Sequence, residues 1–305
     1  MDGGGAAVLV ATSISSEVAR CLGTRARIRV HSAFARAVNL CLEGSVPAQL
    51  PLGMVTLARQ EVGNLPNGIL VSAGAMPLRS LVGERHSVWL EGGRLYLEGG
   101  EVDLRGARSW DASLKGLRGR GWGAGWRGRW ALAWRSLSLA VGAVPASPLW
   151  GVAAGRVERL VDALEGCALG EAIDAARGLV GLGPGLTPSG DDLLVGLLVG
   201  LQGRPVSDQQ GRLVATWGKS VVASAHRTTD VSRVYLDWAA RGWATQRLRD
   251  VAEAVLCPGV EGRLDAAVAA GLDVGSTSGA DGLLGLLLGL RMWMNESEED
   301  DANAT

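Results

Sequence analysis

The chain has 305 residues, of which 47% are hydrophobic and 20% are charged, and its formal net charge is −1 at pH 7. This composition is that of a globular protein long enough for one large domain or two ordinary ones. A net charge so close to zero provides no basic field that would attract nucleic acid or an anionic membrane. We therefore expect neither as a partner, while a small anionic substrate stays open because a local site can be positive.

Cysteine usage and apolar run lengths indicate the compartment. The four cysteines lie far apart and form no CxxC pair; they are Cys21, Cys41, Cys167 and Cys257. This spacing fits neither a zinc ribbon nor a dense disulfide scaffold. The first residues lack the basic region of a signal peptide, and the most apolar runs, 193–201 and 283–290, are shorter than the roughly 20 residues that cross a bilayer. We predict a cytoplasmic protein without a membrane span.

Short apolar or alternating runs between residues 25 and 111 predict β-strands. These runs are 27–30, 38–42, 54–58, 68–72, 87–91 and 94–98. Gly92 and Gly93 separate the last two runs and indicate a tight hairpin. Several short strands divided by turns predict an antiparallel sandwich or barrel-like domain over residues 1–112.

Residues 113–147 are rich in Trp, Arg and Gly and predict a connecting helix. Four tryptophans recur every fourth residue and would share one helix face; they are Trp122, Trp126, Trp130 and Trp134. Aromatic side chains beside arginines could form a stacking platform for single-stranded nucleic acid. We favour a face packed on the domain or on a partner subunit, because the chain has no other nucleic-acid signature.

From residue 148 onward the apolar spacing is helical. The helical runs are 157–164, 168–180, 212–225, 231–241, 245–255 and 262–270. They predict a helical domain over residues 148–294, followed by an acidic tail, 295–305, of disordered composition. The fold class expected for the whole chain is therefore α+β, with a β-rich N-terminal domain and a mainly α-helical second domain.

The helical domain contains an internal repeat. Residues 185–201 and 275–290 come into register when Pro188 is omitted. The matched pairs are Gly185/Gly275, Thr187/Thr277, Ser189/Ser278, Gly190/Gly279, Asp192/Asp281, Leu194/Leu283, Gly196/Gly285 and Gly200/Gly289. Agreement at so many positions predicts two elements related by a pseudo-twofold axis.

Each copy of the repeat reads as a loop followed by a helix that is apolar on nearly every side, and such a helix must be buried. Glycines four residues apart would let the two helices approach closely, so that their N-termini meet. Backbone amides, hydroxyls and positive helix-dipole ends would then surround a phosphate or a carboxylate. The predicted binding residues are Gly183, Gly185, Thr187, Ser189, Gly190, Thr277, Ser278, Gly279 and Asp281.

Helix capping is the alternative role for the same residues. Ser189 with Asp192, and Ser278 with Asp281, each satisfy the capping-box pattern. We favour a ligand site, because a cap requires neither the upstream Gly-x-Thr nor the additional carboxylate of Asp191. The pair Asp191 and Asp192 could hold Mg²⁺ against a phosphate or act as proton acceptor.

A polar segment between two helical runs supplies further candidates. His226 could donate a proton and Arg227 could meet a substrate carboxylate, while capping of a helix end stays an open alternative for both. The sequence contains no HExxH, Walker loop, GxSxG elbow or strand-linked GxGxxG fingerprint.

Three segments together carry a resemblance to a known family. Residues 183–194 (GPGLTPSGDDLL), residues 275–281 and residues 31–34 together with Asn39 resemble the AllH-like family, long described only as a domain of unknown function. One member is a subunit of bacterial oxamate carbamoyltransferase, and the resemblance spans residues 25–290. Ser32 and Asn39 complete the substrate-binding candidates, although their place among strands is more typical of a structural role.

The resemblance implies more than the residues do. It implies a complex with two companion subunits that acts in allantoin degradation, converting oxalurate and phosphate into oxamate and carbamoyl phosphate. Two other functions fit the residues. One is a non-catalytic scaffold or ligand-binding subunit of such a complex, and the other is a metal-dependent hydrolase using the same acids.

Overall fold

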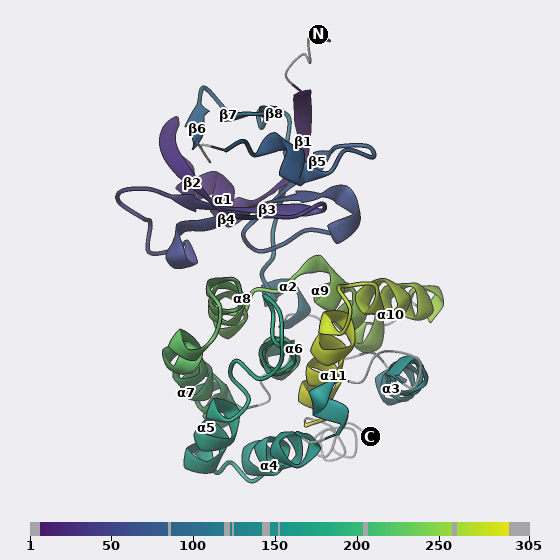
Figure 1. Cartoon of the computed structure of the whole chain (residues 1–305). Coiled ribbons are helices and arrows are strands. Elements are labelled where there is room, and N and C mark those ends of the chain that lie inside the picture. The colour runs from purple at the N-terminus through teal and green to yellow at the C-terminus, as the bar shows by residue number, and fades with distance from the viewer. Residues whose placement is uncertain are drawn as a thin grey trace. The chain divides into compact units, whose positions relative to one another are not determined.

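The computed structural model describes residues 7–84, 87–118, 123, 125–141, 147–151, 153–203, 207–257 and 261–292. The chain divides into two compact units, Met1–Ala112 and Ser113–Thr305, which we call the strand unit and the helical unit. Strands fill the first and helices the second (Figure 1). The α+β fold class predicted from the sequence is confirmed.

The strand unit contains nine described strands, a short helix α1 (Ser16–Cys21) and three 3-10 turns, η1 (Pro51–Gly53), η2 (Gln60–Val62) and η3 (Leu78–Leu81). The strands are β1 (Ala7–Ser15), β2 (Arg25–Ala33), β3 (Ala37–Leu42), β4 (Met54–Arg59), β5 (Gly68–Ser72), β6 (Ser87–Glu91), β7 (Arg94–Leu97), β8 (Gly100–Asp103) and β9 (Arg108–Trp110). The sequence predicts β2 to β7, whereas β1 precedes the region where strands are expected.

The sheet closes into a barrel-like ring through β1. Neighbours follow the order β5-β4-β3-β2-β6-β7-β8-β1, and β1 also pairs with β5. Most pairings are antiparallel, but β4–β5, β1–β8 and β1–β9 are parallel. The predicted hairpin joins β6 to β7, where Gly92 and Gly93 have φ angles of 58° and 75°. Strand residues alternate: Leu90 and Leu95 are buried, while Trp89 is exposed on the outer face.

The helical unit contains ten helices and three 3-10 turns in its described part. These are α2 (Lys115–Arg118), α3 (Trp126–Val141), η4 (Pro148–Trp150), α4 (Ala154–Glu165), α5 (Leu169–Arg177), α6 (Ser189–Gly203), α7 (Asp208–Ser224), η5 (Ala225–Arg227), α8 (Asp230–Ala240), α9 (Gln246–Leu256), η6 (Glu261–Arg263), α10 (Leu264–Leu272) and α11 (Ser278–Arg291).

The repeat helices α6 and α11 form the centre of the core. They contact each other along their length, and α3, α8, α9 and α10 pack against one or both of them (Figure 1). Nearly every residue of both helices is buried, as expected for helices without a polar face. Within the described residues, no helix is both long and apolar enough to cross a membrane.

The tryptophan face of α3 packs onto the helical unit. Trp126 is buried, and the Trp130 Nε1–H donates to the carbonyl oxygen of Leu287 on α11 at 2.8 Å. Trp130 and Trp134 stack with their ring centroids 5.3 Å apart. The favoured interpretation, a face packed on the domain, is therefore confirmed for these three residues, while Trp122 lies outside the described residues.

Replacing Trp130 by Phe should test this attachment. We expect the Trp130→Phe substitution to lower the free energy of unfolding by about 1 kcal/mol, because it removes one partly buried hydrogen bond. Urea unfolding followed by circular dichroism measures the change. Leu132 lies on the same helix with 55% of its surface exposed, so Leu132→Ala should stay within about 0.5 kcal/mol of the parent. Equal effects of the two substitutions would contradict the packing role.

Candidate functional site

The two repeat helices pack backbone against backbone. A Cβ atom added at Gly196 would lie 1.9 Å from the carbonyl oxygen of Gly282, and one added at Gly285 would lie 2.0 Å from that of Leu193. In the repeat alignment Gly196 corresponds to Gly285, and Leu193, three residues earlier, corresponds to Gly282. The contact from each helix to the other is therefore the same contact with the two repeats interchanged. The helices are therefore parallel and related by a pseudo-twofold axis, as the repeat predicts.

The same reciprocity holds one turn further along. A Cβ atom at Gly200 would lie 2.4 Å from the Leu286 carbonyl oxygen, and one at Gly289 would lie 2.8 Å from that of Leu197. Because only glycine leaves room for such approach, all four glycines are required for this pairing. Parallel helices in this register must begin beside each other.

A hydroxyl–hydroxyl contact joins the two helix starts. Thr187 Oγ1 lies 3.0 Å from Ser278 Oγ, although the two residues are 91 positions apart in the sequence. Thr187 belongs to the loop before α6, and Ser278 is the first residue of α11. The predicted meeting of the two N-termini is thus confirmed, and it brings polar atoms of both repeats to one place.

Asp192 faces the partner repeat. Burial raises the pKa of Asp192 well above its ordinary value of 3.8; the hydroxyls of Ser278 and Thr187 oppose this rise, while the nearby charge of Asp281 adds to it. One of its carboxylate oxygens, Oδ2, is enclosed and makes no hydrogen bond. Tyr235 on α8 is close enough that the charge of Asp192, together with burial as the larger cause, raises the pKa of its phenol to about 12.

Asp281 occupies the equivalent position on α11. Its side chain is 0% exposed, and neither carboxylate oxygen makes a hydrogen bond of ordinary geometry. The hydroxyls of Ser147, Ser189 and Thr277 nevertheless lie near enough to lower the pKa of Asp281, against the larger effect of burial, which raises it. Each carboxylate thus faces a serine hydroxyl of the opposite repeat and the threonine hydroxyl of its own.

The capping alternative does not hold for the second copy of the repeat. Helix α11 begins at Ser278, and its N-cap residue is Thr277, whose side chain makes no capping hydrogen bond. Ser278 and Asp281 therefore do not form the capping box that their spacing allows. Their polar atoms point to the shared cluster instead.

Two glycines at the helix starts serve packing. The Gly190 amide donates to the Leu182 carbonyl oxygen at 2.9 Å, and the Gly279 amide donates to that of Val274 at 2.8 Å. A Cβ atom added at Gly190 would lie 2.0 Å from the carbonyl oxygen of Leu179, and one added at Gly279 would lie 2.3 Å from that of Gly271, near the end of α10. These two amides are engaged within the protein, so the hydroxyls and carboxylates are the groups that converge between the helices.

Asp191 points elsewhere and links two loops. Its Oδ1 accepts from the Gly181 amide at 2.9 Å, and its Oδ2 accepts from the Thr228 hydroxyl. Burial raises the pKa of Asp191, and these hydrogen bonds partly offset the rise. Both oxygens of Asp191 are thus engaged, and the acidic pair that meets across the repeat is Asp192 with Asp281. The Mg²⁺ pair expected from the sequence, Asp191 with Asp192, stays a prediction.

The loop before α6 depends on glycine. Gly183 and Gly185 have φ angles of 115° and 95°, a region that other residues rarely adopt. A Cβ atom at Gly183 would lie 2.9 Å from the Ser189 amide nitrogen, whereas the space around Gly185 is open. Gly185 is therefore the one of the two beside which a ligand would have room.

His226 and Arg227 are exposed and lie in the turn between α7 and α8. His226 Nδ1 lies 2.9 Å from the Ala223 carbonyl oxygen, and the Arg227 guanidinium donates to that of Arg177 at 3.0 Å. Both side chains thus contact carbonyl groups at helix ends, which is the arrangement of the capping alternative. Neither contact brings them to Asp192.

Ser32 and Asn39 lie in the strand unit within a row of polar side chains. Asn39 Nδ2 donates to Ser32 Oγ at 2.9 Å, and Thr56 Oγ1 donates to Asn39 Oδ1 at 2.8 Å. Asn67 Nδ2 extends the row to Thr56 Oγ1 at 3.1 Å, and the buried Oδ1 of Asn67 makes no hydrogen bond. The row crosses β2, β3 and β4, and sequence reasoning identified only its first two members.

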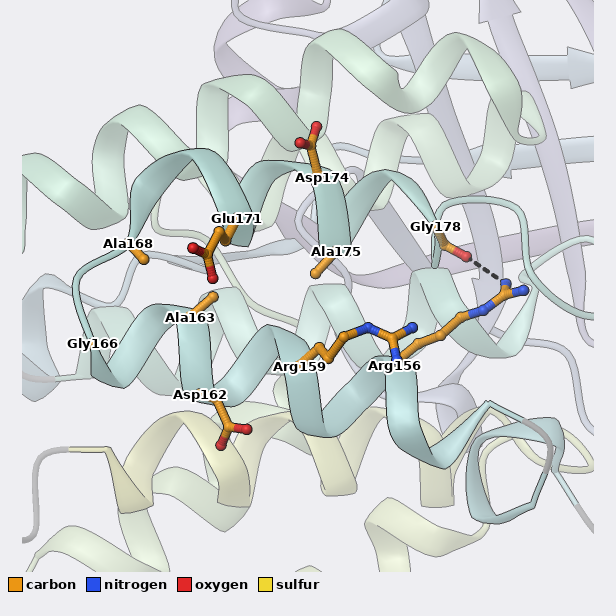
Figure 2. Close-up of a pocket in the computed structure, with 10 residues that line it drawn as sticks. All are labelled: Arg156, Arg159, Asp162, Ala163, Gly166, Ala168, Glu171, Asp174, Ala175 and Gly178. Carbon is orange, nitrogen blue, oxygen red and sulfur yellow. Dashed lines mark hydrogen bonds between the residues drawn. The ribbon is translucent and has the colours of Figure 1, made fainter.

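A groove lies between α4 and α5, away from the repeat residues. Small residues line its floor and charged residues its rim, and the Arg156 guanidinium donates to the Gly178 carbonyl oxygen at 3.0 Å (Figure 2). The lining residues are Arg156, Arg159, Asp162, Ala163, Gly166, Ala168, Glu171, Asp174, Ala175 and Gly178. No sequence motif pointed to this groove, nor to Tyr235 and Ser147 beside the acidic pair.

Two family models match the chain. The model described as oxamate carbamoyltransferase subunit AllH matches residues 179–290, and the model of the AllH family N-terminal domain matches residues 10–109. The first match contains both copies of the repeat, and the second contains most of the strand unit. No solved structure matches the chain.

Proposed function

The chain belongs to the AllH family, whose description is that of an oxamate carbamoyltransferase subunit, and from this we propose that it works within a carbamoyltransferase complex. The reaction would join phosphate and oxalurate to give carbamoyl phosphate and oxamate. A phosphate oxygen forms a bond to the carbamoyl carbon, and the bond from that carbon to the oxamate nitrogen breaks. The nitrogen must gain a proton as it leaves.

We propose that the anionic substrate binds where α6 and α11 begin. The observation that supports this most directly is the 3.0 Å contact between Thr187 and Ser278, which joins the two repeats into one polar cluster. Two helix starts also contribute positive dipole ends, which favour a phosphate or a carboxylate. Hydroxyls of Ser189 and Thr277 lie in the same cluster, beside Asp281.

Asp192 is the group we propose for proton transfer. Because burial raises the pKa of Asp192 well above 3.8, this carboxyl can carry a proton nearer to neutral pH than an exposed aspartate can. His226 and Arg227 remain candidates for the substrate carboxylate, and reaching it would require their side chains to leave the helix-end carbonyls. Ser32 and Asn39 remain binding candidates of the strand unit, as part of its polar row.

The family description implies other protein subunits. We propose two companions, as the resemblance suggests, and a cytoplasmic location, where the free cysteines found in the described residues would stay reduced. The chain alone is then expected to be inactive.

Carbamoyl phosphate formation from oxalurate and phosphate tests the proposal, measured with the chain alone and with its companion subunits. Activity is expected only in the full set. Asp192→Asn should lower kcat about a hundredfold, because it removes a group that transfers a proton. Thr187→Ala should lower it to a lesser degree, whereas Thr187→Ser, which keeps the hydroxyl, should retain most activity.

The exposed Asp174 provides a matched control, and Asp174→Asn should leave kcat unchanged. Full activity of folded Asp192→Asn and Thr187→Ala variants would show that the site is wrong. If the same variants lost ligand binding while the complex still turned over, the chain would be a non-catalytic ligand-binding subunit.

A further inference from the structure

Two carboxylates with enclosed oxygens stand at the place where the proposed function requires an anion. Asp281 is fully buried and Asp192 adjoins it across the pseudo-twofold axis. Two negative charges would repel a phosphate far more than two helix starts attract it, since each start carries only about half a positive charge. Either protons that the carboxyls retain or a bound cation must therefore neutralise this charge before an anion can bind beside it.

We propose that a divalent cation, in the first place Mg²⁺, binds between the starts of α6 and α11 with Asp192 and Asp281 as its carboxylate ligands. The observation behind this is a set of unsatisfied oxygens. Asp192 Oδ2 and both oxygens of Asp281 are enclosed by protein and make no hydrogen bond. Buried charged oxygens without partners are rare, because the loss of hydration is not compensated.

The surrounding donors fit a hard cation. Hydroxyls from both repeats face the two carboxylates, with Ser278 and Thr187 near Asp192 and Ser189 near Asp281. Carboxylate and hydroxyl oxygens suit Mg²⁺, Mn²⁺ and Ca²⁺, whereas the nitrogen and sulfur ligands that zinc prefers are not part of this cluster. Each copy of the repeat thus contributes one carboxylate and equivalent hydroxyls, on opposite sides of the pseudo-twofold axis.

The proposed ligand pair differs from the one expected from the sequence. Asp191 is adjacent to Asp192 in the chain, but its oxygens accept from Gly181 and Thr228. Among the described residues, no group of three His, Cys, Asp or Glu side chains is placed to hold a metal ion. The cation would therefore rest on two carboxylates, completed by hydroxyls, water and, if the proposed function holds, an oxygen of the substrate.

Mn²⁺ binding to the full-length chain tests the site without substrate or companion subunits. Electron paramagnetic resonance of free Mn²⁺ should show one bound ion per chain, displaced by Mg²⁺, and either cation should raise the melting temperature measured in a chelator-treated sample. Asp281→Asn and Asp192→Asn should each weaken Mn²⁺ affinity at least about tenfold. Asp265→Asn, at an exposed aspartate in the first turn of α10, should leave the affinity unchanged.

Each outcome separates this proposal from the proposed function. A folded parent chain that binds no Mn²⁺ at millimolar concentration, or that binds it equally in all three variants, would overturn the cation site while leaving carbamoyl transfer open. Stabilisation by Na⁺ or K⁺ alone would likewise overturn it. A third outcome is that Asp281→Asn abolishes Mn²⁺ binding while the parent complex forms no carbamoyl phosphate. This result would support the cation site and contradict the proposed function.

Discussion

Gly285→Ala is expected to destabilise the chain by more than about 3 kcal/mol, at the upper end of what an added methyl group costs in a packed core. The reason is geometric, since the new Cβ atom would lie 2.0 Å from the Leu193 carbonyl oxygen. Backbone cannot move aside as a flexible side chain can, so the two helices must separate. Folded domains are stable by only about 5–15 kcal/mol, and the loss is therefore a large share.

Urea unfolding of the variant measures this effect, and Gly128→Ala on α3 is the matched control. No heavy atom lies within 4 Å of a Cβ atom at Gly128, so the control should gain up to about 1 kcal/mol from helix propensity. Because Gly196 is the reciprocal position, Gly196→Ala should be as harmful as Gly285→Ala. A Gly285→Ala variant as stable as the parent would show that α6 and α11 do not pack in this register.

Asp192→Asn is expected to stabilise the chain at pH 7 in the presence of a chelator while it lowers kcat about a hundredfold. An isosteric amide avoids the cost of burying a charge. Since burial raises the pKa of Asp192 well above 3.8, we expect the variant to be more stable than the parent at pH 7. Such exchanges of stability against activity are typical of functional sites.

The free energy of unfolding is expected to fall as the pH rises. Well below pH 3.8 the carboxyl is protonated in both the folded and the unfolded chain, so its ionisation does not affect the free energy of unfolding. As the pH rises above 3.8, the unfolded chain releases the proton while the folded chain retains it, and the free energy of unfolding falls. Asp281 and Asp191 also have raised pKa values and act in the same direction, whereas Tyr235 stays neutral in this range.

Unfolding free energies between pH 4 and pH 8 therefore should fall with pH in the parent and fall less in Asp192→Asn. The exposed Asp265→Asn should follow the parent. A parent chain whose stability rises over this range, or an Asp192→Asn variant with an unchanged slope, would mean that Asp192 is ionised and well compensated when folded. In that event its role in proton transfer would also fail.

Much of the helical unit follows from local pattern. A helix that is apolar on every side has to be buried, and glycines at four-residue spacing leave a groove that another backbone can enter. The repeat therefore predicts both that α6 and α11 pair and that their starts meet. Six strands and the Gly92–Gly93 hairpin follow in the same way from short-range alternation and turn residues.

The closure of the strand unit depends on partners that lie far away in the sequence. Strand β1 pairs with β5 about 60 residues later and with β8 about 90 residues later, and no short-range pattern encodes such pairing. The same holds for Ser147 and Tyr235, whose proximity to Asp281 and Asp192 results from helix packing alone.

By itself the sequence determined the repeat, the burial of its helices and the kinds of polar atom gathered at their starts, because these depend on composition and spacing along one segment. Only the tertiary structure decided which two aspartates lie together. Asp191 and Asp192 are neighbours in the chain, yet on a helix adjacent side chains point about 100° apart. That rotation turns Asp191 towards Gly181 and Thr228, and leaves Asp192 facing Asp281 across the axis.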